Sequence, residues 1–195
     1  GGFSSHIPVP SEDLCLVGDR GDMPLEHLSV VADAITSPYQ AAKRADIQEG
    51  DLVLITGATG GIGVYMTQIA AALGAKEVIS VARNKEKLER SLSFGATHAI
   101  STLDKSSKDI RNDFRAYCKE KGLPNYGWKI FECSGSKAGQ EISLEILSFI
   151  GKMLVVGYGM HRVEYMFSRL MAFDAEVIGT WGCLPGYYPE VLKMV

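Results

Sequence analysis

Residues 52–73 read LVLITGATGGIGVYMTQIAAAL, and the fold class can be inferred from this stretch outward. The first five letters form an apolar run of the length typical of a buried strand. A glycine-rich turn, GATGGIG at 57–63, follows directly, and apolar residues then recur from Ile62 to Leu73 at the spacing of one helical face. Gly74 ends this predicted helix, because glycine readily adopts the conformation of a helix C-cap. The stretch therefore predicts a strand, a tight turn and a helix in direct succession.

The same alternation continues along the rest of the chain. Further strands are expected at 78–81, 98–100, 128–132, 153–156 and 176–179, and helical spacing is found at 88–92, 110–117, 142–150 and from 189 onward. Strands that alternate with helices about every 25 residues predict a parallel sheet with helices on both faces. Right-handed crossovers make such a sheet doubly wound. The expected fold class is therefore α/β, a doubly wound parallel sheet.

The glycine-rich turn is the first candidate site. Glycines permit a tight turn and let backbone N–H groups approach a pyrophosphate, which the positive end of the following helix also attracts. Position between a strand and a helix separates a dinucleotide site from chance glycines. A plain strand-to-helix turn is the alternative, and the strand and helix units that follow argue against it. The residues expected to bind the dinucleotide are Gly57, Thr59, Gly60, Gly61, Ile62 and Gly63.

The end of the second predicted strand bears on the choice of cofactor. A dinucleotide fingerprint continues with an acidic residue about 20 positions further on, which binds the ribose 2′-hydroxyl. Here that position carries Ala82 and Arg83, with Lys87 nearby. A carboxylate would repel a 2′-phosphate, whereas a guanidinium pairs with it. These residues favour NADP(H), although NAD(H) can still bind through its pyrophosphate; the alternative for Arg83 is a solvated loop residue.

Composition and charge exclude several classes of protein. The 195 residues are 46% hydrophobic and 22% charged, which is typical of a globular chain and excludes disorder. The net charge is −3 without a basic block, so a nucleic-acid partner gains no electrostatic support. No run of 18 apolar residues occurs, so no membrane span is expected. The scattered cysteines form no C-x-x-C pair and favour free thiols in a reducing compartment, for which we expect the cytoplasm.

The sequence of the glycine-rich turn has to be compared with two families of oxidoreductases. Residues 56–63 fit the TG-x-x-x-G-x-G pattern of short-chain dehydrogenases, which also need a Tyr-x-x-x-Lys pair far downstream. The pairs that begin at Tyr39 and Tyr117 lie before the turn or too close to it. The chain instead resembles the medium-chain dehydrogenase/reductase superfamily, the relatives of zinc alcohol dehydrogenases. The residues that carry this resemblance are 33–41, 50–63, 87–89, 94–97, 131–135 and 155–157.

The resemblance implies a division of the chain. In this superfamily the Rossmann cofactor domain interrupts a GroES-like catalytic domain. Residues 1–45 would then be the end of that catalytic domain with a connecting helix, and residues 46–195 the dinucleotide-binding domain. The chain would be a fragment lacking most of the GroES-like domain, and we expect it to form a homo-oligomer through the cofactor domain.

The resemblance also assigns residues, none of them catalytic. Asp33 falls at the position of the third ligand of a catalytic zinc, which a carboxylate can provide; its alternative role is a charge near the start of the helix at 36–45. Thr36 would lie near the nicotinamide. Residues at the ends of the fourth and fifth strands would hold the cofactor, and strand-end packing is their alternative role. These strand-end residues are Cys133, Ser134, Gly157 and Tyr158.

Three stretches, 128–140, 170–175 and 181–189, also resemble the 6-hydroxycyclohex-1-ene-1-carbonyl-CoA dehydrogenases of benzoyl-CoA degradation. This resemblance implies hydride transfer from a β-hydroxy acyl-CoA to a nicotinamide cofactor, with zinc in the intact enzyme polarising the hydroxyl. That branch uses NAD and carries an acid where this chain has Ala82, so NAD(H) and NADP(H) both remain open. The alternatives are a zinc-free quinone or enoyl reductase and a nucleotide-binding module without activity. We expect this chain alone to bind a dinucleotide without turning over alcohol.

Overall fold

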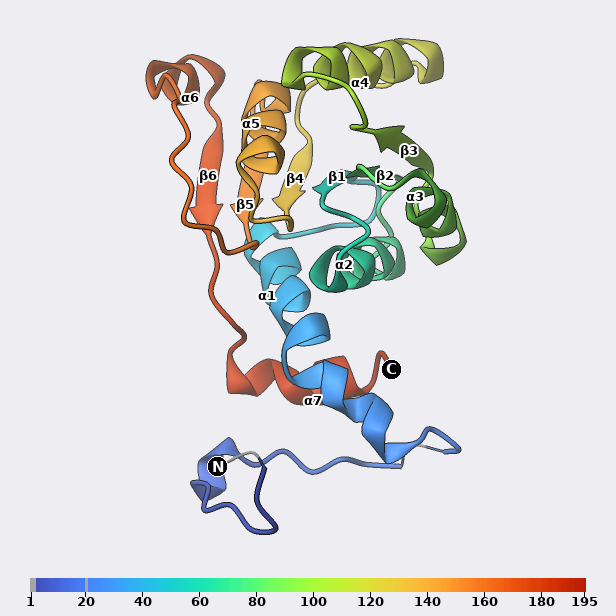
Figure 1. Ribbon diagram of the computed structural model, residues 1–195, viewed down its shortest axis with the longest axis vertical. Helices are drawn as coiled ribbons and strands as arrows, with labels where there is room; N and C mark the ends of the chain where they lie inside the picture. Colours follow the sequence, from blue (N-terminus) through green and yellow to red (C-terminus); the bar gives the residue numbers. More distant parts are fainter. Residues whose placement is uncertain (1–2, 20) are drawn as a thin grey trace.

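The computed structural model describes residues 3–19 and 21–195. In this part of the chain six strands form one parallel sheet in the order β3-β2-β1-β4-β5-β6 (Figure 1). The strands are β1 (Leu52–Thr56), β2 (Glu77–Ala82), β3 (His98–Ser101), β4 (Lys129–Glu132), β5 (Lys152–Val155) and β6 (Glu176–Gly179). The strand order reverses between β1 and β4, which is the doubly wound Rossmann arrangement. The predicted fold class is confirmed.

Helices flank the sheet on both faces (Figure 1). They are α1 (Thr36–Ala45), α2 (Gly61–Ala72), α3 (Lys85–Ser91), α4 (Ser107–Lys121), α5 (Lys137–Ile146), α6 (Ser168–Phe173) and α7 (Tyr188–Leu192). Short helical turns lie at Ser11–Asp13, Leu25–Val30, Leu92–Phe94 and Pro185–Tyr187, and the π-helical turn η3 at Val31–Ile35. Among the described residues, no helix has the length and apolar character needed to cross a bilayer.

Two hydrophobic cores, one on each face of the sheet, explain the apolar run of β1. Val53 and Ile55 of β1 pack into the core that holds α1 and α2, whereas Leu54 packs into the core that holds α4 and α5. Successive side chains of a strand point to opposite faces. A strand covered on both faces therefore needs apolar residues at successive positions, which is the pattern of residues 52–55.

Most element boundaries differ from the sequence prediction by a few residues, and the largest difference at a helix C-terminus follows α5. The helix expected over 142–150 ends at Ile146, because the next residue, Leu147, is extended with a ψ of 125°. The side chains of Phe149 and Ile150 are 54% and 60% exposed. Their backbones form hydrogen bonds with other segments: the Phe149 carbonyl accepts from Gly127 N–H, and Ile150 N–H donates to the Phe173 carbonyl. Helix α6 was not predicted. Strand β5 begins at Lys152, one residue before its predicted start, and the helix predicted from 189 onward covers Tyr188–Leu192.

Helix α7 lies beside η3 and the start of α1, far along the sequence from both (Figure 1). The Tyr39 hydroxyl donates to Glu190 Oε2 over 2.5 Å, and Lys43 Nζ lies 3.7 Å from the same oxygen. The Tyr188 hydroxyl donates to the carbonyl of Ala32. Polar contacts therefore join α7 to the helical segment that precedes β1. Helix α1, which precedes the predicted domain boundary at residue 45, packs against α2, which follows that boundary. The boundary itself stays a prediction.

The Tyr39 contact predicts a stability change in alkaline solution. Burial and the hydrogen bond to the Glu190 carboxylate raise the pKa of Tyr39 from 10.0 to about 12. A raised folded-state pKa stabilises the fold below the unfolded value, and this contribution is lost as the pH rises from about 10 to about 12. Thermal unfolding should therefore show that Tyr39→Phe loses less stability than the wild type across this window. Tyr126→Phe, at an exposed tyrosine, is the control, and equal losses in wild type and Tyr39→Phe would contradict the assignment.

Candidate dinucleotide-binding site

The glycine-rich turn lies at the carboxyl edge of the sheet, where the strand order reverses. Strand β1 ends at Thr56 and its neighbour β4 ends at Glu132, and these two residues are register partners. Parallel α/β sheets bind ligands in the crevice at such a reversal. The turn and the loop after β4 are in close contact, because a Cβ on Gly57 would lie 2.7 Å from Ser134 Cβ.

The glycines of the turn have different roles. Gly57 has a φ of 75°, which glycine adopts without strain, and a Cβ on Gly63 would lie 2.2 Å from the Gly57 carbonyl oxygen. These two glycines let α2 pack directly on the turn. A Cβ on Gly61, by contrast, would meet no atom within 4 Å. Gly61 is exposed at the first position of α2, where no side chain caps the helix, so the fold leaves this helix end open to an anion.

Two pockets meet at the loop after β4. The Arg83 pocket has a volume of about 500 Å³. Its walls include Gly57, Thr59, Gly60, Ala82, Arg83, Thr102, Cys133 and Ser134. The Asp33 pocket has a volume of about 440 Å³. Its walls include Asp33, Ile62, Cys133, Ser134, Gly157, Tyr158, Thr180 and Trp181. Because Cys133 and Ser134 line both, the two pockets adjoin at this loop, as the two halves of a dinucleotide require.

Most residues expected at the site from the sequence line these two pockets, but Thr36, Gly61, Gly63 and Lys87 do not. A third pocket, of about 520 Å³, shares Thr59 and Gly60 with the Arg83 pocket, and Lys87 lines it together with Gly61. The Lys87 backbone N–H bonds the Asn84 side chain that caps α3. Thr36 is fully buried as the first residue of α1 and lines neither the Arg83 nor the Asp33 pocket. The structure therefore brings Ala82 and Arg83 together with the turn in one pocket and Lys87 together with it in the adjoining one, whereas Thr36 lines none of these pockets.

Asp33 was the expected metal ligand. It lies in η3, and its Oδ1 accepts a hydrogen bond of 2.6 Å from the Ser37 hydroxyl. The part of the chain that the structure describes contains no group of three or more His, Cys, Asp or Glu side chains that could hold a metal ion. A tetrahedral zinc site needs three or four protein ligands, so Asp33 alone does not form one.

A buried carboxylate at this edge was missed by sequence reasoning. Glu132, the last residue of β4, is 0% exposed. Its carboxylate accepts hydrogen bonds from the Ser134 hydroxyl, from Ser134 N–H at 2.9 Å and from Gly135 N–H at 3.2 Å. Burial raises the pKa of Glu132, and these hydrogen bonds oppose that shift. A charged residue directly after the apolar pair Ile130 and Phe131, at the end of a predicted strand, is the signal that could have found it.

The neighbouring thiol has no charge of its own to offer a ligand. Burial raises the pKa of Cys133, with a further contribution from Glu132. Cys133 is therefore a neutral, polarisable wall of both pockets. The expectation of free thiols is confirmed, since Cys15, Cys118, Cys133 and Cys183 form no disulfide.

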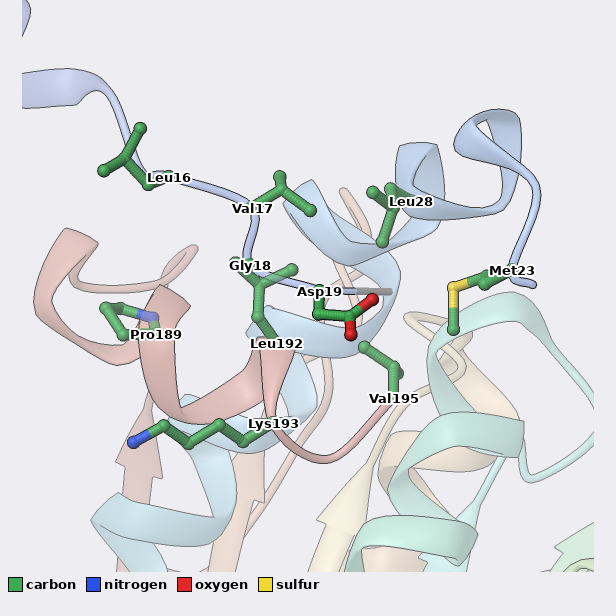
Figure 2. A pocket seen from close by; sticks show the side chains of 10 residues that line it. All are labelled: Leu16, Val17, Gly18, Asp19, Met23, Leu28, Pro189, Leu192, Lys193 and Val195. Carbon is green, nitrogen blue, oxygen red and sulfur yellow. The ribbon is translucent and has the colours of Figure 1, made fainter. Parts of the chain in front are cut away.

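Another pocket, of about 540 Å³, lies away from the sheet edge (Figure 2). Leu16, Val17 and Leu28 approach it from the N-terminal segment, and Leu192 and Val195 from the end of the chain. It shares no residue with the glycine-rich turn or with the loop after β4. This pocket is therefore separate from the candidate dinucleotide site.

The sheet, the turn and the adjoining pockets have the arrangement of a Rossmann domain, and comparisons with known proteins give the family. The model of the zinc-binding dehydrogenase family matches residues 61–195, and the chain belongs to this family. It is 28% identical over 184 residues to galactitol 1-phosphate 5-dehydrogenase of Escherichia coli (strain K12), covering 93% of this chain and 50% of the relative. D-xylulose reductase of Saccharomyces cerevisiae is 26% identical over 164 residues, covering 84% of this chain and 45% of the relative.

Solved structures agree with the fold. The crystal structure of galactitol-1-phosphate dehydrogenase from Escherichia coli matches with a TM-score of 0.76 at 26% identity, over 89% of this chain and 50% of that chain. The chain thus spans about half the length of the curated relatives it matches. The resemblance to zinc-type dehydrogenases is confirmed at the level of the family.

The two kinds of glycine predict opposite outcomes for one substitution. Gly61→Val adds its side chain to open space, so we expect the variant to fold and to lose at least about tenfold in dinucleotide affinity, because backbone approach to the pyrophosphate is blocked. Gly63→Val forces a clash with the Gly57 carbonyl and should unfold at a clearly lower temperature. Thermal unfolding and calorimetric titration with NADH measure both. Binding by Gly61→Val at wild-type affinity would mean that the turn is merely structural.

Proposed function

We propose that this chain is the cofactor-binding part of an NAD(P)-dependent oxidoreductase that acts on an alcohol. One observation carries the proposal: the uncapped start of α2 lies between two pockets that adjoin at Cys133 and Ser134. Membership of the zinc-binding dehydrogenase family supports the same activity. The names of the relatives, a galactitol 1-phosphate dehydrogenase and a D-xylulose reductase, support an alcohol as the substrate.

The residues of the chain bind and orient the cofactor, whose nicotinamide ring supplies the acceptor for hydride. The start of α2 holds the pyrophosphate through backbone N–H groups and the helix dipole. The Arg83 pocket takes the adenosine half, because its cation lies at the end of β2. The Asp33 pocket takes the nicotinamide half, where Tyr158 and Trp181 offer exposed aromatic surface for ring contact.

The substrate class follows from the relatives more than from the site. Their names favour a polyol over the β-hydroxy acyl-CoA, which rests on the resemblance of 128–140, 170–175 and 181–189 alone. Assays of the intact enzyme with both substrate classes distinguish them. The zinc-free quinone or enoyl reductase is the competing activity, and it predicts turnover that a metal chelator leaves unchanged.

Self-association through the cofactor domain also stays a prediction. Strand β6 is one of the two edge strands of the sheet, and its Val177 is 41% exposed. Met166, Phe167 and Met171, which lead into β6, are 68%, 78% and 79% exposed. An unpaired edge with apolar neighbours is a surface on which a second copy could add its own strand. The small-molecule substrate and the lack of a nucleic-acid partner are likewise predictions.

Titration of this chain with NADH, NADPH and ADP tests the proposal. We expect saturable binding of a dinucleotide, and tighter binding of the dinucleotide than of ADP, because ADP reaches only the Arg83 pocket and the start of α2. Calorimetry measures the affinities, and the emission of bound NADH reports enclosure of the nicotinamide. Failure of both dinucleotides to bind would contradict the proposed function. Equal affinities for ADP and the dinucleotides would remove the Asp33 pocket from the site.

Arg83 predicts the preference between the two cofactors. A charge-assisted pair with the 2′-phosphate contributes about 1.5–3 kcal/mol, which corresponds to about ten- to a hundredfold in affinity. We therefore expect Arg83→Ala to weaken NADPH binding by about this factor and NADH binding much less, and Ala82→Asp to favour NADH. Lys85→Ala, a nearby cation that lines neither pocket, is the control. A wild type that prefers NADH, with both affinities unaltered in Arg83→Ala, would refute the charge argument.

A further inference from the structure

Glu132 joins two loops that border the site. Its carboxylate accepts from the N–H groups of Ser134 and Gly135, in the loop after β4. Its backbone carbonyl accepts from the N–H groups of Val156 at 2.9 Å and Gly157 at 2.8 Å, in the loop after β5. Both loops line the Asp33 pocket. One residue therefore sets the position of two walls of that pocket.

Ser134 has little freedom to move once Glu132 holds it. Its hydroxyl donates to Glu132, and its Oγ lies 2.9 Å from Ser136 Oγ. A Cβ on Gly139 of α5 would lie 2.0 Å from Ser134 Oγ, and a Cβ on Gly57 would lie 2.7 Å from Ser134 Cβ. Ser134 is exposed to solvent, but the glycine-rich turn and α5 bound it on two sides. A displacement of the Glu132 carboxylate must move Ser134 and the surface it presents to both pockets.

A charge in this place is costly for the fold alone. Burying a carboxylate without an opposite charge is unfavourable, and apolar replacements of buried ionic groups are often neutral or stabilising. Among the described residues Glu132 takes part in no ion pair, and hydrogen bonds are its compensation. Its bonds go to the loop that both pockets share. The cost of burying this charge is therefore offset by hydrogen bonds that fix a loop lining both pockets.

We propose that Glu132 is a positioning residue for the dinucleotide: its carboxylate turns the N–H groups of Ser134 and Gly135 inward and holds the shared wall of the two pockets in the shape that binds the cofactor. This inference rests on the proposed function. Glu132 itself is fully buried and lines neither pocket, so it acts through Ser134 and Gly135.

The test compares Glu132→Gln and Ser134→Ala with the wild type. The glutamine side chain keeps the size but loses the negative charge. It also replaces Oε2, which accepts from Gly135 N–H at 3.2 Å, with an N–H₂ donor that would face this N–H group. We expect the NADH dissociation constant to rise by about tenfold or more in Glu132→Gln and by about three- to tenfold in Ser134→Ala. ADP affinity should fall less, because the shared wall matters most to a ligand that spans both pockets.

The control is Glu77→Gln. Glu77 is the first residue of β2, at the end of the sheet opposite to the carboxyl ends of the strands. Glu77 also accepts hydrogen bonds, from the hydroxyls of Tyr117 and Thr97, and lines neither pocket. We expect its variant to bind NADH within about twofold of the wild type, whatever it loses in thermal stability. The emission of bound NADH should change in Glu132→Gln and not in Glu77→Gln. Glu132→Asp, which keeps the charge, should recover part of the affinity.

Each outcome bears on one claim. If the wild type binds no dinucleotide, the proposed function fails. If the wild type binds and folded Glu132→Gln binds NADH equally well, the positioning role is wrong. An equal loss in Glu77→Gln would also overturn it, because the effect would then be a general loss of sheet stability. If Glu132→Gln does not fold, Ser134→Ala decides, and an unchanged NADH affinity in that variant overturns the proposal.

Discussion

A Cβ on Gly63 would lie 2.2 Å from the Gly57 carbonyl oxygen, and a Cβ on Gly157 would lie 2.2 Å from the Gly135 nitrogen. Backbones meet directly at these points because side chains are missing, and the loops after β1, β4 and β5 are packed as one layer. The loops after β1 and β4 line the Arg83 pocket, and the loops after β4 and β5 line the Asp33 pocket. The site therefore depends on close backbone approach more than on any single polar side chain.

The sheet order determines where that layer can form. Strands β1 and β4 are neighbours although about 75 residues separate them, and their carboxyl ends meet at the reversal point. The turn after β1 supplies an uncapped helix start, and the loop after β4 supplies a wall common to both pockets. The two charged side chains near this layer have opposite surroundings. Arg83 is exposed and available to an anion, whereas the Glu132 carboxylate is buried and turned toward backbone N–H groups.

Sequence prediction was most accurate where one local rule governs the chain. The strand at 176–179 was predicted with its observed ends, and Gly122 ends α4 with a φ of 65°, as a C-cap glycine does. It was wrong at 147–150, where the apolar spacing continues but Leu147 leaves the helix and Phe149 packs on Phe173, with ring centroids 4.8 Å apart. Helix α6 has six residues and carries too short a pattern for periodicity to reveal.

The doubly wound sheet and the glycine-rich turn could be inferred from the sequence alone, because both depend on residue types at fixed short spacings. The absence of an acid at Ala82 was equally plain there. Tertiary contacts were needed to show that Lys87 and Arg83 line different pockets, that Thr36 is buried, and that Cys133 and Ser134 form a wall shared by two pockets. They also revealed Glu132 as the link between two loops. These contacts join segments distant in the chain, and local spacing carries no information about them.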